Sequence, residues 1–367
     1  MKMKSNSELK FMQKAIALAR KGSFRASPNP KVGCVLVKKG RIISQGRHQH
    51  FGGRHAEINA LRKAGAKAKG STMYINLEPC VHYGKTPPCT VAIIKAGIKK
   101  IVVGMIDPNP LVKGKGLREL KAKRIKVRLG VLREECAKLN EPYIKYITRG
   151  IPFVILKSAM SLDGKIATQK GDSKWITSEA SRKYAKALRS QVDAILVGIG
   201  TVIKDNPGLL GGNSKKRPVR IIVDSRLRIP LNARVLNSRA PTIVATRKGA
   251  DKRRIENLQD RGVEVLPIPR WRKHPQRGLD LKFLMKKLAE RGITSLLIEG
   301  GGKVNASALE MGLVDKVLFF IAPKIVGGED AITPVEGEGI DRIGKARRLK
   351  DTRIRRFGED LLFEGYV

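Results

Sequence analysis

Four residues in the first quarter of the chain have the side chains needed to hold and assist a catalytic zinc ion. His55 and Glu57 belong to a His-Ala-Glu triplet, and Cys80 and Cys89 each follow a proline. One imidazole and two thiolates form a three-ligand site with an open fourth position, which is typical of catalytic rather than structural zinc. Zinc held in this way lowers the pKa of a bound water, and the resulting hydroxide can attack an aromatic carbon that carries an amino group. Glu57 is then free to carry a proton from that water to the departing ammonia.

The spacing of the two cysteines narrows the class of deaminase. Zinc-dependent nucleobase deaminases share the pattern His-x-Glu followed by Pro-Cys-x-x-Cys. Here eight residues, not two, separate Cys80 from Cys89. The long form at 79–89 resembles the deaminase domain of the bifunctional deaminase–reductase family of riboflavin biosynthesis, which reads Pro-Cys-x-His-x-Gly-x-Thr-Pro-Pro-Cys. The stretches 28–33 and 107–110 agree with the same family.

This resemblance extends over almost the whole first half of the chain and implies roles for individual residues. It implies a zinc-bound deaminase site with the ligands His55, Cys80 and Cys89, the proton carrier Glu57 and the pocket residues Asn29, His48 and His82. A purely structural zinc site is the alternative for the three ligands. Surface exposure or packing is the alternative for the last two histidines.

The second half carries a separate set of motifs. Residues 157–167 resemble the opening strand of the reductase of the same family, a relative of dihydrofolate reductase. Further on, the cluster Gly300-Gly301-Gly302 follows the apolar stretch 295–298 and precedes an expected helix from about Val304. Glycines at such a turn let a phosphate approach closely, and the start of the helix offers free N–H donors. Alone, this run would equally suit a simple tight turn; beside the other motifs it resembles the loop that binds the NADPH diphosphate.

The resemblance also implies the ligands of the reductase half. The NADPH contacts that it implies are Ala159, Trp175, Thr201, Asp205, Ser225, Gly301, Gly302, Lys303, Val304, Asn305, Ala306 and Ser307. The contacts to the ribosyl substrate that it implies are Ser173, Arg189, Leu209 and Glu299. The implied reaction is hydride transfer to C1′ of the opened ribose, which depends mainly on placing the nicotinamide and the substrate together.

One stretch of the reductase half departs from the family pattern. The family usually continues Asn-Pro-x-Leu-Thr-x-Arg, and its arginine helps to hold the substrate phosphate, whereas this chain has Gly212 at that position. Lys215, Lys216 and Arg217 are candidate replacements, because a flexible lysine can neutralise a phosphate without bidentate geometry. We expect an active reductase, with a degenerate or altered-specificity reductase as the alternative.

The length and the order of predicted elements indicate two α/β domains. At 367 residues the chain exceeds the size at which a single core usually stops growing. The pattern pauses near 148–152, so we expect a cytidine-deaminase-like α/β/α deaminase domain at 1–148 and a dihydrofolate-reductase-like α/β reductase domain at 149–367. Strand and helix patterns alternate in both, and the second half predicts a mostly parallel sheet flanked by helices.

The charge suggests a competing function. A formal net charge of +43 is compatible with a basic RNA-acting deaminase, but the basic residues are spread along the chain and aromatic residues make up only 5% of it. RNA-binding modules usually offer aromatic stacking surfaces, so nucleic acid is not the expected partner. A phosphorylated substrate would be attracted by the same field. A monofunctional zinc deaminase with a C-terminal assembly domain is a further alternative.

Composition also indicates in which compartment of the cell the protein works. No apolar run reaches the ~18 residues of a membrane-spanning helix, and the N-terminus lacks the features of a secretory signal. Four cysteines are too few for a disulfide scaffold in a chain of this length, which favours a reducing cytoplasm. The family resemblance suggests a homodimer or homotetramer. We therefore expect a cytoplasmic homo-oligomer that deaminates a phosphoribosylaminopyrimidine and then reduces its ribosyl group to a ribityl chain, with Zn²⁺ and NADPH as cofactors.

Overall fold

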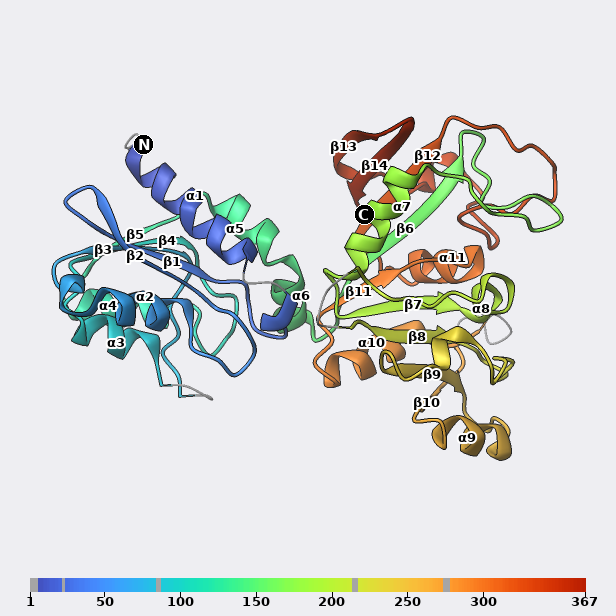
Figure 1. The fold of residues 1–367 in the computed structure, drawn as a ribbon, viewed down its shortest axis with the longest axis horizontal. Coiled ribbons are helices and arrows are strands. Elements are labelled where there is room, and N and C mark those ends of the chain that lie inside the picture. Colours follow the sequence, from blue (N-terminus) through green and yellow to red (C-terminus); the bar gives the residue numbers. More distant parts are fainter. Residues whose placement is uncertain (1–5, 22–23, 84–86, 213–216, 273–277) are drawn as a thin grey trace. The chain divides into compact units, whose positions relative to one another are not determined.

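The computed structural model describes residues 6–21, 24–83, 87–212, 217–272 and 278–367. The chain divides into two compact units, Met1–Gly150 and Ile151–Val367 (Figure 1). The division falls two residues after the predicted boundary between 148 and 149. Gly150 has a φ of 66° and ends the last helix of the first unit, where a left-handed residue commonly closes a helix.

The first unit is built on a five-stranded sheet with the order β2-β1-β3-β4-β5. Its strands are β1 (Gly33–Lys38), β2 (Arg41–Arg47), β3 (Thr72–Leu77), β4 (Lys100–Met105) and β5 (Lys126–Leu129). Its α-helices are α1 (Asn6–Lys21), α2 (Ala56–Ala64), α3 (Cys89–Lys95), α4 (Lys115–Ala122), α5 (Arg133–Leu139) and α6 (Glu141–Arg149). Strand β1 is antiparallel to β2 and β3, whereas β4 is parallel to both of its neighbours, β3 and β5.

Helices cover both faces of this sheet, which explains why β1 and β3 are buried along nearly their whole length (Figure 1). Successive side chains of a strand point to opposite faces. Cys34 and Leu36 pack with α2, α3 and α4, whereas Val35 and Val37 pack with α1 and α5. Each fully buried aliphatic side chain of this kind contributes about 1.5–3 kcal/mol. The result is the predicted α/β/α arrangement.

A glycine lets the helix that carries Glu57 lie close to the sheet. A Cβ atom added at Gly46 in β2 would lie 2.1 Å from the carbonyl oxygen of Ala56 and 2.5 Å from the backbone nitrogen of Ala60, both in α2. Any side chain at this position would therefore push the helix away. The close approach fixes where α2 begins, and His55 is the residue directly before it.

The second unit is built on a nine-stranded sheet with the order β10-β9-β8-β7-β11-β6-β12-β14-β13. Its strands are β6 (Phe153–Ser161), β7 (Ala194–Gly198), β8 (Val219–Val223), β9 (Thr242–Arg247), β10 (Glu264–Ile268), β11 (Ser295–Ile298), β12 (Lys316–Ala322), β13 (Lys350–Phe357) and β14 (Asp360–Tyr366). Its α-helices are α7 (Glu179–Arg189), α8 (Ile199–Asp205), α9 (Lys252–Gln259), α10 (Leu281–Glu290) and α11 (Gly302–Glu310).

In sheet order, each pair of neighbouring strands from β10 through β9, β8, β7, β11 and β6 to β12 is parallel. The pairs of β14 with β12 and with β13 are antiparallel. The prediction of a mostly parallel sheet flanked by helices is confirmed. Leu196 faces the core that α10 and α11 complete, and its neighbours Ile195 and Val197 face the core that includes residues of α7, α8 and α9. In such sheets the turns at the carboxyl ends of the strands are the usual place for ligands.

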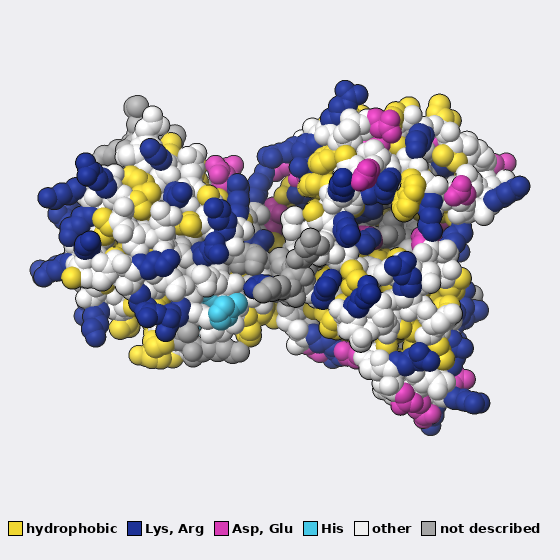
Figure 2. All heavy atoms as spheres, in the orientation of Figure 1, with side chains coloured by type: hydrophobic (Ala, Val, Ile, Leu, Met, Phe, Trp, Pro, Cys, Tyr) yellow, Lys and Arg dark blue, Asp and Glu magenta, His cyan; other side chains and the backbone are white. Residues whose placement is uncertain are grey.

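Charge is distributed broadly over the surface. On the face shown in Figure 2, Lys and Arg side chains are scattered over both units without forming a single patch. None of the described helices combines the length and the apolar character that crossing a membrane requires. The surface therefore offers no counterpart to the concentrated basic groove of a nucleic-acid-binding protein on this face.

Candidate functional site

Two parts of the first unit, the start of α2 and the connection from β3 into α3, bring a histidine and two cysteines together. His55 precedes α2, Cys80 lies in the loop after β3, and Cys89 is the first residue of α3. Their ligand atoms all lie within 4.8 Å of one another. His55 Nδ1 is 3.2 Å from Cys89 Sγ and 3.5 Å from Cys80 Sγ. Two sulfur atoms and one imidazole nitrogen at these separations fit a single zinc ion.

The electrostatics of this cluster favour a bound cation. The hydrogen bond that the Cys89 thiol donates to Cys80 lowers the pKa of Cys80 to about 4, helped by a hydrogen bond with His55. The backbone N–H of Cys89 also donates to Cys80 Sγ, at 3.4 Å. The hydrogen bond with Cys80 raises the pKa of His55. A thiolate therefore forms readily here, and thiolates are the form of cysteine that binds metals.

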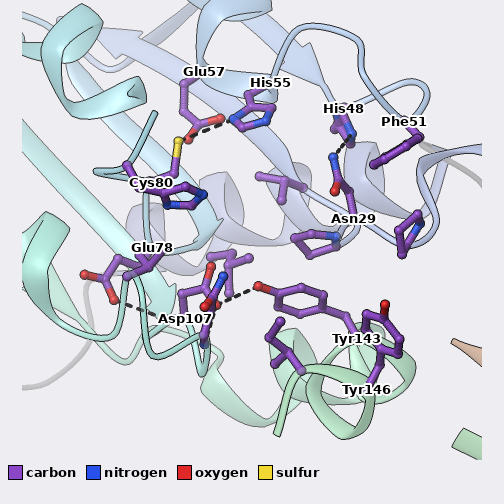
Figure 3. Close-up of a pocket in the computed structure, with 18 of the residues that line it drawn as sticks. Asn29, His48, Phe51, His55, Glu57, Glu78, Cys80, Asp107, Tyr143 and Tyr146 are labelled. Carbon is purple, nitrogen blue, oxygen red and sulfur yellow. Dashed lines mark hydrogen bonds between the residues drawn. The ribbon is translucent and has the colours of Figure 1, made fainter. Parts of the chain in front are cut away.

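Glu57 lies beside the three ligands without belonging to the set. Its side chain comes from the first turn of α2, is 3% exposed and points towards His55 and Cys80 (Figure 3). Burial raises the pKa of Glu57, so its carboxyl group takes up a proton more readily than an exposed glutamate, as a proton carrier requires. The donor set thus fits an open zinc site with a proton carrier next to it.

A cavity of about 270 Å³ opens in front of this cluster. Asn29, His48 and His82, the three predicted pocket residues, all lie in its wall. His48 Nε2 is 3.2 Å from Asn29 Nδ2, and the His48 ring stands edge-on to that of His55 with 5.4 Å between the ring centres (Figure 3). The structure therefore places the predicted pocket residues and the predicted zinc ligands around one space.

Sequence reasoning missed two cavity residues that come from distant elements. Asp107 follows β4, and Tyr143 lies in α6. The Tyr143 hydroxyl donates a hydrogen bond of 2.9 Å to Asp107 Oδ1 (Figure 3). Burial raises the pKa of Asp107 to about 6. The motif at 107–110 was a signal for the aspartate, but nothing in the local sequence indicates that α6 returns to the site.

In the second unit, two turns lie side by side at the carboxyl ends of β7 and β11. The N–H of Gly198 donates to the carbonyl of Gly300 at 3.3 Å. Thr201 Oγ1 lies 3.8 Å from where a Cβ atom of Gly301 would be, and Val304 borders both turns. Gly301 has a φ of 84°, which favours glycine. The structure thus brings together predicted cofactor residues from α8 and from the start of α11.

The remaining predicted NADPH contacts lie on separate elements. Gly302 and Asn305 are buried in α11, and Asn305 Nδ2 donates to the carbonyl of Pro334 at 2.7 Å. The predicted contacts that are partly or fully exposed are Ala159 in β6, Trp175, Asp205 in α8, Ser225 after β8, and Lys303, Ala306 and Ser307 in α11. Gly301 and Gly302 keep side-chain bulk low at the start of α11, where the first N–H groups of a helix are suited to a diphosphate group.

Arg189 and Glu299, two of the predicted substrate contacts, form a two-pronged ion pair. Arg189 Nε lies 2.7 Å from Glu299 Oε1, and Nη2 lies 2.6 Å from Oε2. The Glu299 side chain is 4% exposed. Although burial opposes ionisation, the charge and hydrogen bonds of Arg189 lower the pKa of Glu299. Burial lowers the pKa of Lys157, which is also close enough to Glu299 to feel its charge.

The other predicted substrate contacts are less uniform. Ser173 is partly exposed, whereas Leu209 is 2% exposed and its side chain belongs to a hydrophobic core. Gly212, which replaces the family arginine, donates its N–H to Ser190 Oγ at 2.8 Å. Of the candidate replacements, Arg217 is exposed. Lys215 and Lys216 lie outside the described residues.

Two family models match the chain, one in each unit. Residues 5–105 match the family model described as the cytidine and deoxycytidylate deaminase zinc-binding region. Residues 152–363 match the model described as the RibD C-terminal domain. The chain is 45% identical to the riboflavin biosynthesis protein RibD of Actinobacillus pleuropneumoniae, covering 99% of this chain and 96% of the relative. It is 46% identical to RibD of Aquifex aeolicus, with 96% of each chain covered.

Solved structures extend the similarity to three dimensions. RibD of Acinetobacter baumannii, form 1, has a TM-score of 0.88 at 37% identity, with 98% of each chain covered. A Thermotoga maritima protein titled diaminohydroxyphosphoribosylaminopyrimidine deaminase/5-amino-6-(5-phosphoribosylamino)uracil reductase has a TM-score of 0.86 at 38% identity, also with 98% of each covered. These relatives favour two enzymatic units, with zinc and NADPH as cofactors, over a monofunctional or RNA-acting deaminase. The chain belongs to the RibD family of bifunctional deaminase–reductase enzymes of riboflavin biosynthesis.

Proposed function

We propose that the chain deaminates 2,5-diamino-6-(5-phosphoribosylamino)pyrimidin-4(3H)-one to 5-amino-6-(5-phosphoribosylamino)uracil and then reduces the ribosyl group to a ribityl chain with NADPH. The observation that carries the first step is the meeting of His55, Cys80 and Cys89 next to a buried Glu57. The similarity of the chain to the Thermotoga maritima protein, whose title gives both activities, supports both substrates.

For the deamination, we assign the three zinc ligands as above and Glu57 as the proton carrier. Zinc, when bound, is a Lewis acid that lowers the pKa of water at the site. Glu57 would carry one proton of that water to the ring nitrogen and the second to the departing amino group, and its raised pKa suits these transfers. Asn29, His48 and His82 in the cavity wall hold the pyrimidine or the phosphoribosyl group.

For the reduction, the start of α11 and the neighbouring turn at Thr201 hold the cofactor. NADPH supplies the hydride. Arg189 and Glu299, locked to each other, present a fixed polar surface to the ribosyl group, because neither side chain can rotate without breaking two hydrogen bonds. Ser173 and Leu209 complete the proposed substrate contacts, although Leu209 is only 2% exposed. Holding both reactants in place is the main contribution of the protein to this step.

We also propose the bounds of the two domains, the assembly of the protein and its place in the cell. Residues 1–148 form the deaminase domain and residues 149–367 form the reductase domain. A homo-oligomer in the cytoplasm is the expected working form, as in the family that the chain resembles. Analytical ultracentrifugation of the zinc-loaded protein tests whether it is a homo-oligomer. Fractionation of the cells that make it tests whether it lies in the cytoplasm.

Mass spectrometry of the reaction products tests both steps at once. The zinc-loaded protein is incubated with the diaminopyrimidinone ribosyl phosphate, with and without NADPH. A product that carries oxygen in place of the amine and two added hydrogens supports both activities. The deaminated species alone would contradict the reductase half. Unchanged substrate with a folded, zinc-loaded protein would contradict the whole proposal.

A further inference from the structure

The carboxylate of Glu78 collects three backbone hydrogen bonds in the wall of the deaminase cavity. The residue directly follows β3 and is 3% exposed. Oε2 accepts the N–H of Asp107 at 3.2 Å and that of Gly114 at 2.9 Å. Oε1 accepts the N–H of Leu117 at 3.1 Å. All three donors belong to one segment, 107–117, which joins β4 to α4.

Glu78 thereby caps a helix that has no capping side chain of its own. Helix α4 starts after Gly114, and the first N–H groups of a helix lack partners within it. Two of the bonds that Glu78 accepts come from this cap position and from Leu117 in the first turn. Negative charge is favoured at this end of a helix, where a capping bond is worth about 1 kcal/mol. The position of α4 thus depends on a carboxylate from another element.

The segment also lies too close to the zinc-ligand loop for an ordinary side chain. A Cβ atom added at Gly116 would lie 2.4 Å from the carbonyl oxygen of Pro79 and 3.2 Å from Glu78 Oε1. Pro79 directly precedes the zinc ligand Cys80. Glu78 and its partners therefore set the spacing between the loop that carries this ligand and the start of α4.

Two cavity residues depend on this spacing. Asp107 and Asn109 belong to the segment and line the cavity. The N–H of Asn109 donates to Asp107 Oδ1 at 2.9 Å, and the Tyr143 hydroxyl donates to the same oxygen. The backbone of Asp107 is itself fixed by Glu78 (Figure 3). Movement of the segment would shift Asp107 and Asn109 relative to the zinc ligands.

We propose that Glu78 is a positioning residue of the deaminase site, which acts through Asp107 and Asn109 and not on the reacting atoms. The proposal rests on the proposed deaminase function. Glu78→Gln keeps the size of the side chain but replaces one acceptor oxygen with an NH₂ group, which faces backbone donors that it cannot satisfy. The segment then loosens while the zinc ligands stay in place.

The test compares wild type, Glu78→Gln and Glu134→Gln as zinc-loaded full-length proteins. Glu134 is exposed on α5, so its variant makes the same change of charge away from the cavity. We expect Glu78→Gln to raise the deaminase KM about tenfold and to change kcat less than about twofold, because substrate contacts are misplaced while the proton carrier is not. Zinc content and the reductase rate should match wild type, and Glu134→Gln should match wild type throughout.

A purely structural role would lower the unfolding temperature of Glu78→Gln and leave its KM unchanged, and that result would overturn the proposal. Loss of zinc together with a fall in kcat would also overturn it, because Glu78 would then act through Cys80. Should Glu78→Gln not fold, Glu78→Asp keeps both acceptor oxygens on a shorter stem, and an unchanged KM in that variant would count against the idea. Failure of wild type to deaminate would instead contradict the proposed function itself.

Discussion

Arg189 and Glu299 meet through two parallel hydrogen bonds, Nε to Oε1 at 2.7 Å and Nη2 to Oε2 at 2.6 Å. Only a guanidinium can make both bonds from one planar group. The pair joins the end of α7 to the residue that follows β11, so it fixes the relative position of these two elements at the proposed ribosyl site.

Replacement of Arg189 by lysine should therefore damage the reductase without removing the positive charge. We expect reductase kcat/KM to fall about 100-fold, because a point charge cannot restore the two-pronged geometry. Deaminase activity of the same preparation is the internal control. An Arg189→Lys enzyme with full reductase activity would show that the planar pairing is not needed.

Glu57→Gln should abolish deamination while the metal stays bound. The amide cannot accept and release a proton, and removal of a general acid–base typically costs about 10²–10⁴ in rate. Zinc content by atomic absorption should remain equal to that of wild type, because Glu57 is not one of the three ligands. Loss of zinc in this variant would contradict the assigned role.

The raised pKa of Asp107 predicts that the stability of the first unit depends on pH. Its pKa is about 6 in the folded protein because of burial, against an ordinary value of 3.8, so between these values the folded state binds the proton that the unfolded state has released. Stability from this group is therefore fully present below pH 3.8, falls as the pH rises from there and is lost once the pH has passed through 6. Wild type should lose about 1 kcal/mol more unfolding free energy than Asp107→Asn between pH 5 and 7.5. Denaturant unfolding of wild type and Asp107→Asn at the two pH values, followed by a signal from the first unit, measures this difference in unfolding free energy.

Gly302→Ala should weaken NADPH binding. The added methyl group would lie 2.7 Å from the carbonyl oxygen of Thr333 and 2.6 Å from Glu336 Cγ, so the start of α11 would have to move. We expect the Kd for NADPH, measured by fluorescence titration, to rise at least about tenfold. Gly344→Ala is the matched control, because a methyl group there meets no atom within 4 Å. Equal Kd values for the two variants would argue against this placement of the cofactor.

Local sequence was sufficient for the elements with a strong apolar pattern. The apolar run at 101–105 by itself indicates the strand β4 (Lys100–Met105), and the spacing of apolar residues among charges at 8–21 by itself indicates the helix α1 (Asn6–Lys21). Strand β5 has no such pattern, because Lys126–Leu129 alternates apolar with charged residues and is only partly buried. Its place at the edge of the sheet comes from pairing with β4, which no local pattern reveals.

The same limit applies to the candidate site. The zinc ligands were identifiable because their residue types are rare and closely spaced in the sequence. Tyr143 was not, because its role depends on α6 returning to a residue 36 positions earlier. Glu78 lies two residues before Cys80 in the sequence, but its role depends on hydrogen bonds from backbone amides 29 to 39 residues away. Contacts of this kind are a product of the fold and leave no pattern in the sequence.

The zinc ligands lie 9 to 34 residues apart along the chain, with His55 just before α2 and Cys80 and Cys89 in the connection from β3 to α3 and at the start of that helix. An ion bound to all of them acts as a cross-link that closes loops of these lengths. The chain therefore loses the conformational entropy of these loops when the site forms. Metal affinity and folding are therefore linked, as in small zinc domains. Chelation should shorten the lifetime of the first unit against proteolysis as well as stop its chemistry, so zinc supply would set the abundance of the enzyme in addition to its rate.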